Sequence, residues 1–487
     1  MQSFQGVEAL RSRYLCYRCV DESFLSNRIR QEGQRHRCFY CKTRRQCFAL
    51  EEVSEIVKKA FEQHYVHTPQ NPDAFEASLL GDRDSSFVWY RRGDPASDAI
   101  ANAAQISQLA ASDVQAILEY ENRNFRPGDA EEETEFADDS HYEEKAASNH
   151  AWRAEWMNFV RSLKTESRFF SHEAASHLES VFVGIERLKS HDGRPIITTA
   201  GPGTKLKKLY RARVFQSQSR LEDAIAHPDS HLGSPPAENA SAGRMNARGI
   251  SVFYGASKAD AAIAEVRPPV GSYVAVARFE IIRPVRLLDL TALNDVRDGG
   301  SIFDPTMISR LERATFLRTL GELITRPVMP DDEAFDYLPT QAIADFLAAL
   351  REPVVDGIVF PSVQAAGSAL NVVLFHKAAR AESIDLPDGT KVKTWVGPTD
   401  EDNNEPDYTV YVETPDTQST EASKKSDLDD FVDLFAPSID ERVHDARTIS
   451  LRVDTKSVTV HHVSRVKVMT REFKVNRRKV VQPVSDI

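Results

Sequence analysis

Four cysteines near the start of the chain have the spacing of a metal site. Cys16 and Cys19 form one Cys-x2-Cys knuckle, Cys38 and Cys41 form a second, and 18 residues separate the two. Each knuckle turns two thiolates toward one point, so two knuckles complete a tetrahedral zinc site with no open position for catalysis. The sequence therefore predicts a structural zinc ion. Cys47 is left over, and we interpret it as a packed thiol rather than a ligand.

A second stretch, GRMNARGISVFYGASKADAAIAEVRP (243–268), offers an arginine, a tyrosine and a glutamate within one strand–helix unit. Ser257 followed by Asp260 resembles a capping box, so a helix should begin there and end before the two prolines. Glu265 then lies on the last helical turn, where the helix dipole does not stabilise a carboxylate. Taken singly, each of these residue types is also common in cores and on surfaces.

Length and composition describe a chain of several domains. Its 487 residues exceed one ordinary domain, and 41% hydrophobic with 28% charged residues is typical of sizeable cores. The net charge of −12 argues against coating by nucleic acid, although residues 11–45 hold ten Lys or Arg against three acids. The first residues lack the apolar core of a signal peptide, and no apolar run approaches the roughly 20 residues that span a bilayer. These features favour a cytoplasmic location, reduced cysteines and no membrane partner.

Residues 51–195 are predicted to form a helical module. EEVSEIVKKAFEQHY (51–65) places its apolar residues on one helical face. Further helices are expected at 98–121, 147–165 and 171–190. Nine acids and no Lys or Arg fall within residues 129–144, a run typical of a solvated loop or linker. Together with the zinc-knuckle segment 1–50, this gives a zinc-stapled N-terminal module that ends at a Gly/Pro-rich boundary near residue 200.

After residue 200 the hydrophobic period changes from that of helices to that of strands. Strands are expected at LYRARVF, ISVFYGA, SYVAVARFEI, VRLLDL, VDGIVF and NVVLFH. Helices fit SKADAAIAEV, ERATFLRTLGELI and TQAIADFLAALRE between them. This pattern predicts a mixed α/β domain over 200–380. Residues 381–487 should hold an acidic linker, from about 396 to 430, and a small β-rich C-terminal hairpin or sheet, so the fold class is α+β multidomain.

Four separated motifs within residues 200–380 resemble the RES domain. They are LYRAR (209–213), GRMN followed by Gly249 and Tyr254, A-x-x-A-E ending at Glu265, and FPSVQAAGSALNVVLF (360–375). The family is named for an arginine, a glutamate and a serine, which here correspond to Arg211, Glu265 and Ser362, with Ser368 as a nearby alternative. Met245 replaces the aromatic residue that commonly follows the Gly-Arg pair. The N-terminal part resembles the HEPN-like zinc-knuckle module that precedes some RES domains.

The resemblance implies an ADP-ribosyltransferase-like fold that acts on NAD, often in bacterial toxins. It makes Glu265, Arg211 and Ser362 the expected catalytic residues, and Arg211, Arg244 and Tyr254 the expected NAD-binding residues. A carboxylate near the ribose stabilises an oxocarbenium-like centre, and guanidinium groups suit an anionic pyrophosphate. Tyr254 offers a flat face and a hydroxyl to nicotinamide, and Ser362 could bind the carboxamide or place the carboxylate. The chain lacks a GxGxxG fingerprint, so hydride transfer on a Rossmann fold is not expected.

Two classes of function follow. The first is an NAD glycohydrolase or phosphorylase, a toxin or defence effector, with ADP-ribosyl transfer to a macromolecule as the alternative that differs only in its nucleophile. The second is an RNA-binding sensor or HEPN-type ribonuclease, motivated by the basic zinc segment. Its candidate Arg–His pairs are poorly placed, one inside the zinc loop and two spaced one residue too closely: Arg30–His36, Arg168–His172 and Arg187–His191. NAD as substrate and structural zinc are expected; an antitoxin or regulatory protein, a second copy of the chain and nucleic acid are left open.

Overall fold

The computed structural model describes residues 4–82, 84–122, 134–362, 364, 368–400, 403–415, 445–467 and 469–478. The chain divides into two compact units, each made of two segments. Unit 1 comprises Met1–Ile196 and Ala292–Pro327, and unit 2 comprises Ile197–Thr291 and Val328–Ile487. The first division lies close to the boundary expected near residue 200. The segment 292–327, however, was expected in the second domain and groups with the first.

A small antiparallel sheet opens unit 1. It follows α1 (Phe4–Arg11) and has the order β1-β3-β2, formed by β1 (Tyr14–Cys16), β2 (Gln34–Arg37) and β3 (Arg44–Ala49). The helices η1 (Tyr17–Cys19) and α2 (Ser23–Glu32) connect β1 to β2. Leu15 and Leu25 are fully buried in a core shared with the helices that follow, so the zinc-knuckle segment is not a separate domain.

The helices expected after residue 50 are present with different ends. α3 (Leu50–His64) buries Val53, Val57 and Phe61, which lie on the predicted apolar face. The helix expected at 98–121 is two helices, α5 (Ala96–Ala104) and α6 (Gln108–Asn122). Gln105 ends the first because it adopts a left-handed conformation with φ of 52°.

A second small sheet of unit 1 has the order β4-β6-β5. Its strands are β4 (Tyr65–His67), β5 (Asp94–Pro95) and β6 (His141–Glu144), and α4 (Ala74–Gly81) follows β4 in the sequence. The acidic run predicted to be a loop therefore ends in a strand. Residues 123–133, which contain much of that run, lie outside the described residues.

Three further helices of unit 1 pack through aromatic side chains. They are α7 (His150–Thr165), α8 (His172–Phe182) and α13 (Met307–Thr325), and Trp156 contacts both Phe159 and Phe316. The Arg313 guanidinium donates to the carbonyl oxygen of Val181, which ties α13 to α8. These contacts explain why 292–327 groups with unit 1. The helix expected at 171–190 ends at residue 182 and is followed by η2 (Ile185–Arg187) and β7 (Lys189–Ser190), which pairs with β13 (Val296–Arg297).

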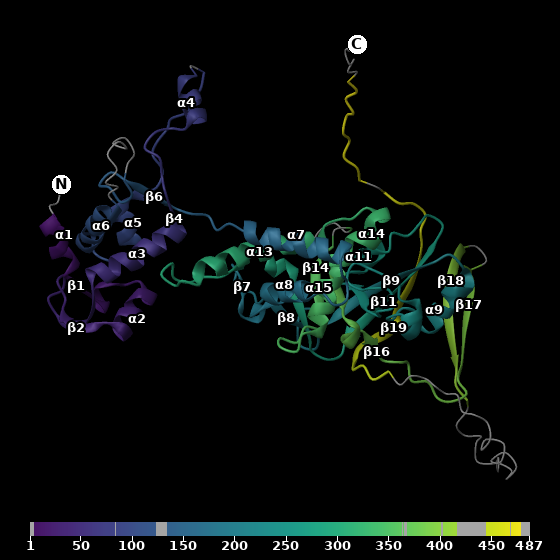
Figure 1. Ribbon diagram of the computed structural model, residues 1–487. Coiled ribbons are helices and arrows are strands. Elements are labelled where there is room, and N and C mark those ends of the chain that lie inside the picture. Colours follow the sequence, from purple (N-terminus) through teal and green to yellow (C-terminus); the bar gives the residue numbers. More distant parts are fainter. Residues whose placement is uncertain are drawn as a thin grey trace. The chain divides into compact units, whose positions relative to one another are not determined.

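Unit 2 is built on a nine-stranded mixed sheet with the order β16-β19-β11-β9-β10-β15-β14-β12-β8 (Figure 1). The strands are β8 (Ile197–Ala200), β9 (Lys208–Phe215), β10 (Phe253–Ala256), β11 (Tyr273–Ile281), β12 (Val285–Asp289), β14 (Gly357–Pro361), β15 (Leu370–Leu374), β16 (Arg380–Ala381) and β19 (Ile449–His462). The β12–β14 and β16–β19 pairs are parallel, and the other pairs are antiparallel. Each of the six strands predicted after residue 200 lies in this sheet.

Side chains on the two faces of the sheet belong to two cores. One contains Leu209, Phe253 and Phe279, together with side chains of α9 (Gln218–Ala226). The other is smaller: Ala261 and Ala262 of α11 (Ala259–Glu265) pack with alanine and valine side chains of β9, β10 and β11. Because these side chains are small, α11 approaches the sheet closely. The remaining helices after residue 200 are α10 (Pro228–His231), η3 (Ala237–Asn239), α12 (Leu290–Leu293), η4 (Pro330–Asp332), α14 (Glu333–Asp336), α15 (Leu338–Ala349) and η5 (His376–Ala378).

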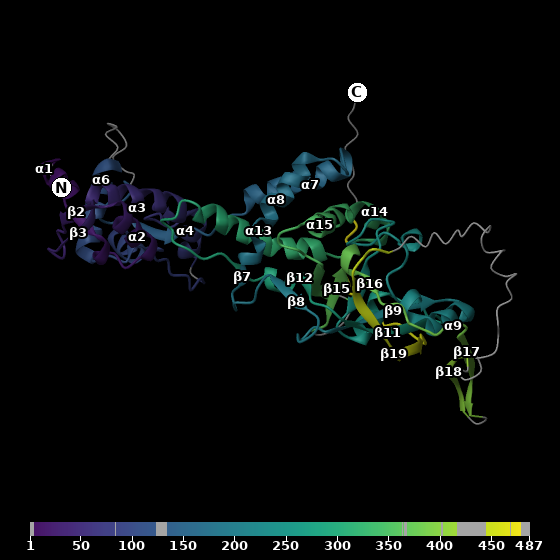
Figure 2. The same ribbon diagram turned by 90° about the horizontal axis from the view of Figure 1, so that it is seen from below.

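The C-terminal region differs from the predicted layout. β17 (Lys391–Asp400) and β18 (Asn403–Glu413) form a hairpin where the acidic linker was expected to begin. β19 does not form a small sheet of its own but pairs with β11, from Tyr273↔His462 to Ile281↔Leu451. Figure 2 shows the yellow β19 beside β11. The C-terminal region is β-rich as expected, but the hairpin or small sheet expected of the last 40 residues is not formed, because Leu451 and Val453 of β19 belong to the core of the main sheet.

The rest of the expected linker, residues 416–444, lies outside the described residues. After β19, residues 464–467 and 469–478 are exposed and without regular secondary structure. Of the helices in the described parts of the chain, none has both the length and the apolar character needed to cross a membrane.

Candidate active site and metal centre

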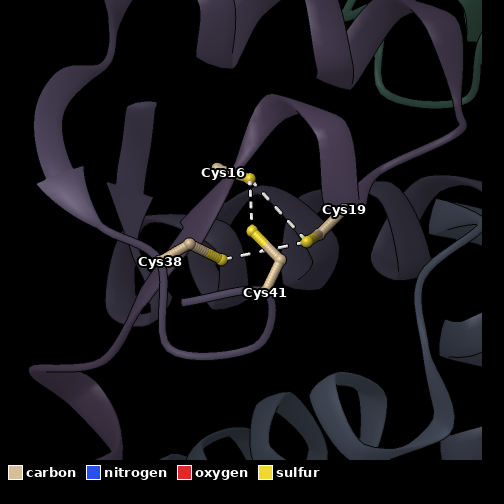
Figure 3. Close-up of side chains that lie close together, drawn as sticks. All are labelled: Cys16, Cys19, Cys38 and Cys41. Carbon is tan, nitrogen blue, oxygen red and sulfur yellow. Dashed lines mark hydrogen bonds between the residues drawn. The ribbon is translucent and has the colours of Figure 1, made fainter. Parts of the chain in front are cut away.

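Four cysteine thiols of unit 1 converge on one point (Figure 3). The Sγ atoms of Cys16, Cys19, Cys38 and Cys41 all lie within 4.8 Å of one another. The Cys16–Cys41, Cys16–Cys19 and Cys19–Cys38 distances are 3.6, 3.7 and 3.8 Å. A tetrahedral zinc ion with Zn–S bonds of about 2.3 Å holds its sulfur atoms roughly 3.8 Å apart. The four cysteines predicted from their spacing are therefore brought together in a geometry that can hold zinc.

Short turns after β1 and β2 create this cluster. Cys16 ends β1 and Cys19 ends η1, while Cys38 and Cys41 occupy the turn between β2 and β3. Lys42 has φ of 59°, a left-handed conformation that redirects the chain after Cys41 into β3. Both knuckles are thus fixed by the same small sheet.

Cys47 is outside the cluster although its Cα pairs with that of Cys16 across β1 and β3. Its thiol donates to the backbone carbonyl oxygens of Arg45 and His36, at 3.3 and 3.6 Å. Burial raises the pKa of Cys47 to about 11, so the thiol is protonated at neutral pH. This environment is that of a packed thiol.

Glu265 is the last residue of α11, as predicted. The start of that helix differs, because α11 begins at Ala259 with Lys258 in the N-cap position and without a side-chain cap. Ser257 is bound to β15 instead. Its amide donates to the Leu370 carbonyl at 2.8 Å, and its Oγ accepts from the Leu370 amide at 2.9 Å. The predicted capping box of Ser257 and Asp260 is therefore wrong.

Two buried side chains donate to one oxygen of Glu265. Ser362 Oγ and Asn371 Nδ2 lie 2.9 and 2.6 Å from Oε1. Ser362 is 8% exposed and Asn371 5% exposed, whereas Glu265 itself is exposed. Ser362 directly follows β14 and Asn371 lies in the neighbouring β15, so the sheet positions both donors beneath the end of α11. They compensate for the unfavourable position of a carboxylate at a helix C-terminus.

Tyr254 holds the Gly-Arg-Met-Asn turn that precedes β10. Its hydroxyl donates to Asn246 Oδ1 at 2.9 Å and accepts from the Met245 amide at 3.0 Å. A Cβ on Gly243 would lie 2.7 Å from both Asn246 Oδ1 and the Tyr254 hydroxyl, so this position requires glycine. The side chain of Tyr254, which lies on β10, therefore fixes the conformation of this turn.

Arg244 lies in the same turn and is anchored through its backbone. Thr340 Oγ1, near the start of α15, donates to the Arg244 carbonyl at 2.6 Å. The half-buried guanidinium lies over the Tyr337 ring, 5.0 Å from its centre. An arginine stacked on an aromatic ring keeps its N–H groups in one plane, which suits bidentate binding of a phosphate.

Arg211 is a half-buried cation in β9. Its guanidinium lies 4.8 Å from the centre of the Phe253 ring, and Nη1 is buried with no hydrogen-bond partner among the described residues. Burial, and then the charge of Arg213, lower the pKa of Arg211 to about 10, so it stays charged at neutral pH. Burial likewise raises the pKa of Tyr254 to about 12, an effect that the charges of Arg211 and Arg244 partly offset. Both guanidinium groups therefore act electrostatically on Tyr254.

The comparison with protein families decides the identity of this region. Residues 208–395 match the model of the RES domain. These residues are a RES domain. The match begins with β9 and ends in β17, and it spans the turn, helix and strands that carry the site. No curated protein matches the chain. The match places these residues in an NAD-related, toxin-like family of enzymes. The HEPN-like character expected of residues 51–195 stays a prediction.

The RES domain of this chain is interrupted and extended. The matched range includes 292–327, which groups with unit 1, and leaves out β8 and β19, which complete the nine-stranded sheet. The expected bounds of 200–380 leave out β19 and nearly all of β8, and they include a helix, α13, that packs in unit 1.

The structure brings the glutamate and the serine of the RES domain together. Ser362 donates to Glu265 although 97 residues separate them. Ser368, the alternative serine, is exposed and makes no hydrogen bond to Glu265 within the described residues. Among the described residues, no hydrogen bond or ion pair joins Arg211 to this pair: it shares a face of β9 with Leu209, whereas Ala212 faces α11. The charge of Arg211 acts instead on Tyr254.

Tyr254 and Asn371 lie on one face of the sheet. Tyr254 pairs with Val373 and Ala256 pairs with Asn371, so Tyr254 and Asn371 are diagonal neighbours on adjacent strands. Asn371 was not among the predicted site residues, because NVVLFH was interpreted as an apolar strand and as the end of a RES motif, without a role for its asparagine. The sequence did contain one signal for it. An asparagine near the start of an apolar strand is expected to be buried, and a buried amide side chain requires a hydrogen-bond partner.

Proposed function

We propose that the RES domain consumes NAD by breaking the bond between nicotinamide and ribose, as a glycohydrolase or phosphorylase. The observation that supports this most is the Glu265 carboxylate, which is exposed yet held at Oε1 by two buried donors. An exposed glutamate normally samples several rotamers, and fixing it removes that freedom before the substrate arrives. Its negative charge then stays where positive charge develops on the sugar.

Cleavage of the bond between nicotinamide and ribose requires little from the protein beyond a negative charge such as that of Glu265. When the N-glycosidic bond breaks, the electron pair leaves with the ring nitrogen, which makes nicotinamide neutral and leaves an oxocarbenium-like ribose. A nucleophile then bonds to the anomeric carbon and releases a proton to solvent. Water gives ADP-ribose, phosphate gives phosphorylated ADP-ribose, and a macromolecular side chain gives an ADP-ribosylated target. Transfer to a macromolecule is the alternative outcome of the same bond cleavage.

The cations and the tyrosine of the site suit the rest of NAD. Arg244 presents its guanidinium, which lies over the Tyr337 ring, for the pyrophosphate. Arg211, on the face of β9 opposite α11, adds positive charge, and its buried Nη1 has no partner among the described residues. The hydroxyl of Tyr254 is hydrogen-bonded within the Gly-Arg-Met-Asn turn. Nicotinamide would therefore contact the aromatic ring of Tyr254 and not its hydroxyl.

A role as a toxin or defence effector in the cytoplasm, controlled by an antitoxin or regulatory protein, rests on the family. Because the chemistry does not need a module as large as unit 1, we propose that unit 1 senses a signal, binds a partner or sets the oligomeric state.

Incubation with NAD tests the activity directly. The full-length protein should release nicotinamide, and the co-product identifies the nucleophile. Arg244→Met should raise KM for NAD about 10–100-fold with a smaller change in kcat, because the guanidinium binds the pyrophosphate in both ground and transition states. Arg248→Met, which removes an exposed arginine four residues further on, should leave KM unchanged. Intact NAD after incubation with water, with phosphate and with cell extract would reject the proposal.

For unit 1 we propose that Cys16, Cys19, Cys38 and Cys41 hold one structural zinc ion. All four positions are filled by protein thiolates, which suits a metal that stabilises the fold and does not bind substrate. The ion would link the turn after β1 to the turn after β2, and thereby fix the small sheet on α2 and α3.

A specific observation favours a second function for unit 1, the binding of nucleic-acid phosphates. Arg37 and Arg44 are directly opposite each other on β2 and β3, and Arg35 lies on the same face opposite Gln46. All three arginines are exposed, and within the described residues none has a carboxylate partner. Like charges directly opposite each other destabilise a sheet, and an anionic ligand would remove that cost. The face therefore suits the phosphate backbone of RNA, the partner left open by the sequence.

Salt dependence of binding distinguishes this surface from an ordinary solvated one. A duplex RNA of about 20 base pairs should bind the protein, and replacing Arg35, Arg37 and Arg44 together by Gln should lower affinity at least about 10-fold and reduce the slope of log K against log salt by about 2–3. The control replaces three exposed arginines elsewhere by Gln: Arg220, Arg297 and Arg351. If both triple variants lose affinity equally, the binding comes from net charge and not from this face.

A further inference from the structure

Asn371 is a polar side chain in an otherwise apolar strand. The strand β15 reads Leu-Asn-Val-Val-Leu, and Val372, Val373 and Leu374 are fully buried. Asn371 is 5% exposed and is paired on both sides, with Ala256 of β10 and with Phe360 of β14. Its backbone is therefore satisfied by the sheet, and its amide group serves something other than the strand itself.

The amide of Asn371 is satisfied on one side only. Nδ2 donates to Glu265 Oε1 at 2.6 Å, whereas Oδ1 is buried and has no partner among the described residues. Turning the amide around would place Oδ1 against the carboxylate, which is repulsive, so the orientation is dictated by Glu265. A buried acceptor without a partner destabilises the fold. Such a cost is typical of residues kept for function rather than for stability.

The two donors leave the second oxygen of Glu265 free. Oε1 accepts from both Ser362 and Asn371, while Oε2 has no hydrogen-bond partner within the described residues. Because one donor directly follows β14 and the other lies in β15, they fix the carboxylate in position as well as in rotation. Serine alone, with one rotatable hydroxyl, would hold the oxygen but not the plane of the carboxylate. Glu265 itself is exposed, so Oε2 remains available to a ligand.

We propose that Asn371 is a positioning residue of the RES site, which orients the Glu265 carboxylate so that Oε2 faces the ribose of NAD. This role rests on the proposed NAD-consuming activity. Asn371 acts through Glu265 and need not touch the substrate. Its effect is on kcat, because a misplaced carboxylate stabilises the transition state less while the pyrophosphate contacts still bind NAD.

Asn371→Leu separates positioning from a structural role. Leucine has a similar size and removes the unsatisfied Oδ1, so the melting temperature should stay the same or rise. The kcat should fall about 10–100-fold, the effect of one hydrogen bond to a charged group, with KM little changed. If the residue were merely structural, the variant would melt at lower temperature and any activity loss would follow the loss of folded protein.

Asn371→Asp gives a second readout in the pH profile. Two carboxylates would then meet at the position of the present 2.6 Å contact, and they can do so only if they share a proton. The acidic limb of kcat/KM should shift to higher pH by at least about one unit, with activity partly recovered above it. Tyr210 and Tyr254 are titratable groups on the strands beneath α11 and are unchanged in this variant. Asn239→Asp, at an exposed site, is the control for the added charge.

The outcomes separate this inference from the proposed function. A wild-type protein that consumes no NAD overturns the function and this role with it. A wild-type protein that does consume NAD, together with an Asn371→Leu variant within about threefold of its kcat and an unshifted profile for Asn371→Asp, overturns the positioning role alone. A lower kcat at unchanged KM with undiminished stability, and a shifted acidic limb, supports it.

Discussion

Replacing Glu265 by glutamine should lower the turnover of NAD by about 10²–10³-fold while its binding changes little. The glutamine Oε1 can still accept from Ser362 and Asn371, so the side chain should keep its place. What is lost is the negative charge facing the ribose, which matters most in the transition state. Initial rates of nicotinamide release, compared with NAD affinity from calorimetry, measure the two effects separately.

Glu238→Gln, at an exposed position outside the site, is the matched control and should have wild-type kinetics. Full turnover in Glu265→Gln would remove the central residue from the proposal. Loss of NAD binding together with turnover would indicate that the carboxylate places the substrate instead of stabilising the developing charge.

Cys38→Ser should abolish zinc binding and unfold the start of unit 1. In small zinc-finger peptides, zinc binding contributes about 10–16 kcal/mol of folding free energy. This is comparable to the ~5–15 kcal/mol free energy of unfolding of a whole domain. Cys16 and Cys38 are fully buried where the two knuckles meet the small sheet, so without the ion the buried residues of this sheet should become accessible to protease. Elemental analysis should fall from about one zinc per chain to nearly none, and limited proteolysis should cut within residues 1–50 first.

Cys47→Ser is the control for this experiment. Cys47 is also buried and lies across the strand from Cys16, but its thiol donates to backbone carbonyl oxygens. A serine there should lose some packing energy and keep the full zinc content. Equal zinc loss in both variants would contradict the four-cysteine site.

Local patterns in the sequence predicted most elements of the RES domain. Alternating or continuous apolar runs predicted the strands β9, β11, β14 and β15. Pro268 and Pro269 predicted that α11 ends at Glu265. The cysteine spacing gave the four-thiol cluster. These features depend on residues close together in the sequence, where period and turn chemistry carry the information.

Features that depend on distant partners could not be predicted in this way. Ser257 has the side chain of an N-cap, but β15 takes both of its polar groups in preference to the helix. β19 alternates like a hairpin strand, yet its partner β11 lies far away in the sequence. The Glu265–Ser362 contact was anticipated only through resemblance to a family, and Asn371 was missed because its partner is on another element.

The position of β19 has a consequence for protein synthesis. β11, the neighbour of the strand that bears Arg211, gains its second partner only when the last strand has been made. About 170 residues separate the two, or roughly 10–30 s of translation at ~5–20 residues per second. During that time the sheet beneath the site has an open edge. The catalytic sheet therefore stays incomplete until β19 has left the ribosome, so an enzyme of the proposed activity would spare the NAD pool of its own cell during that interval.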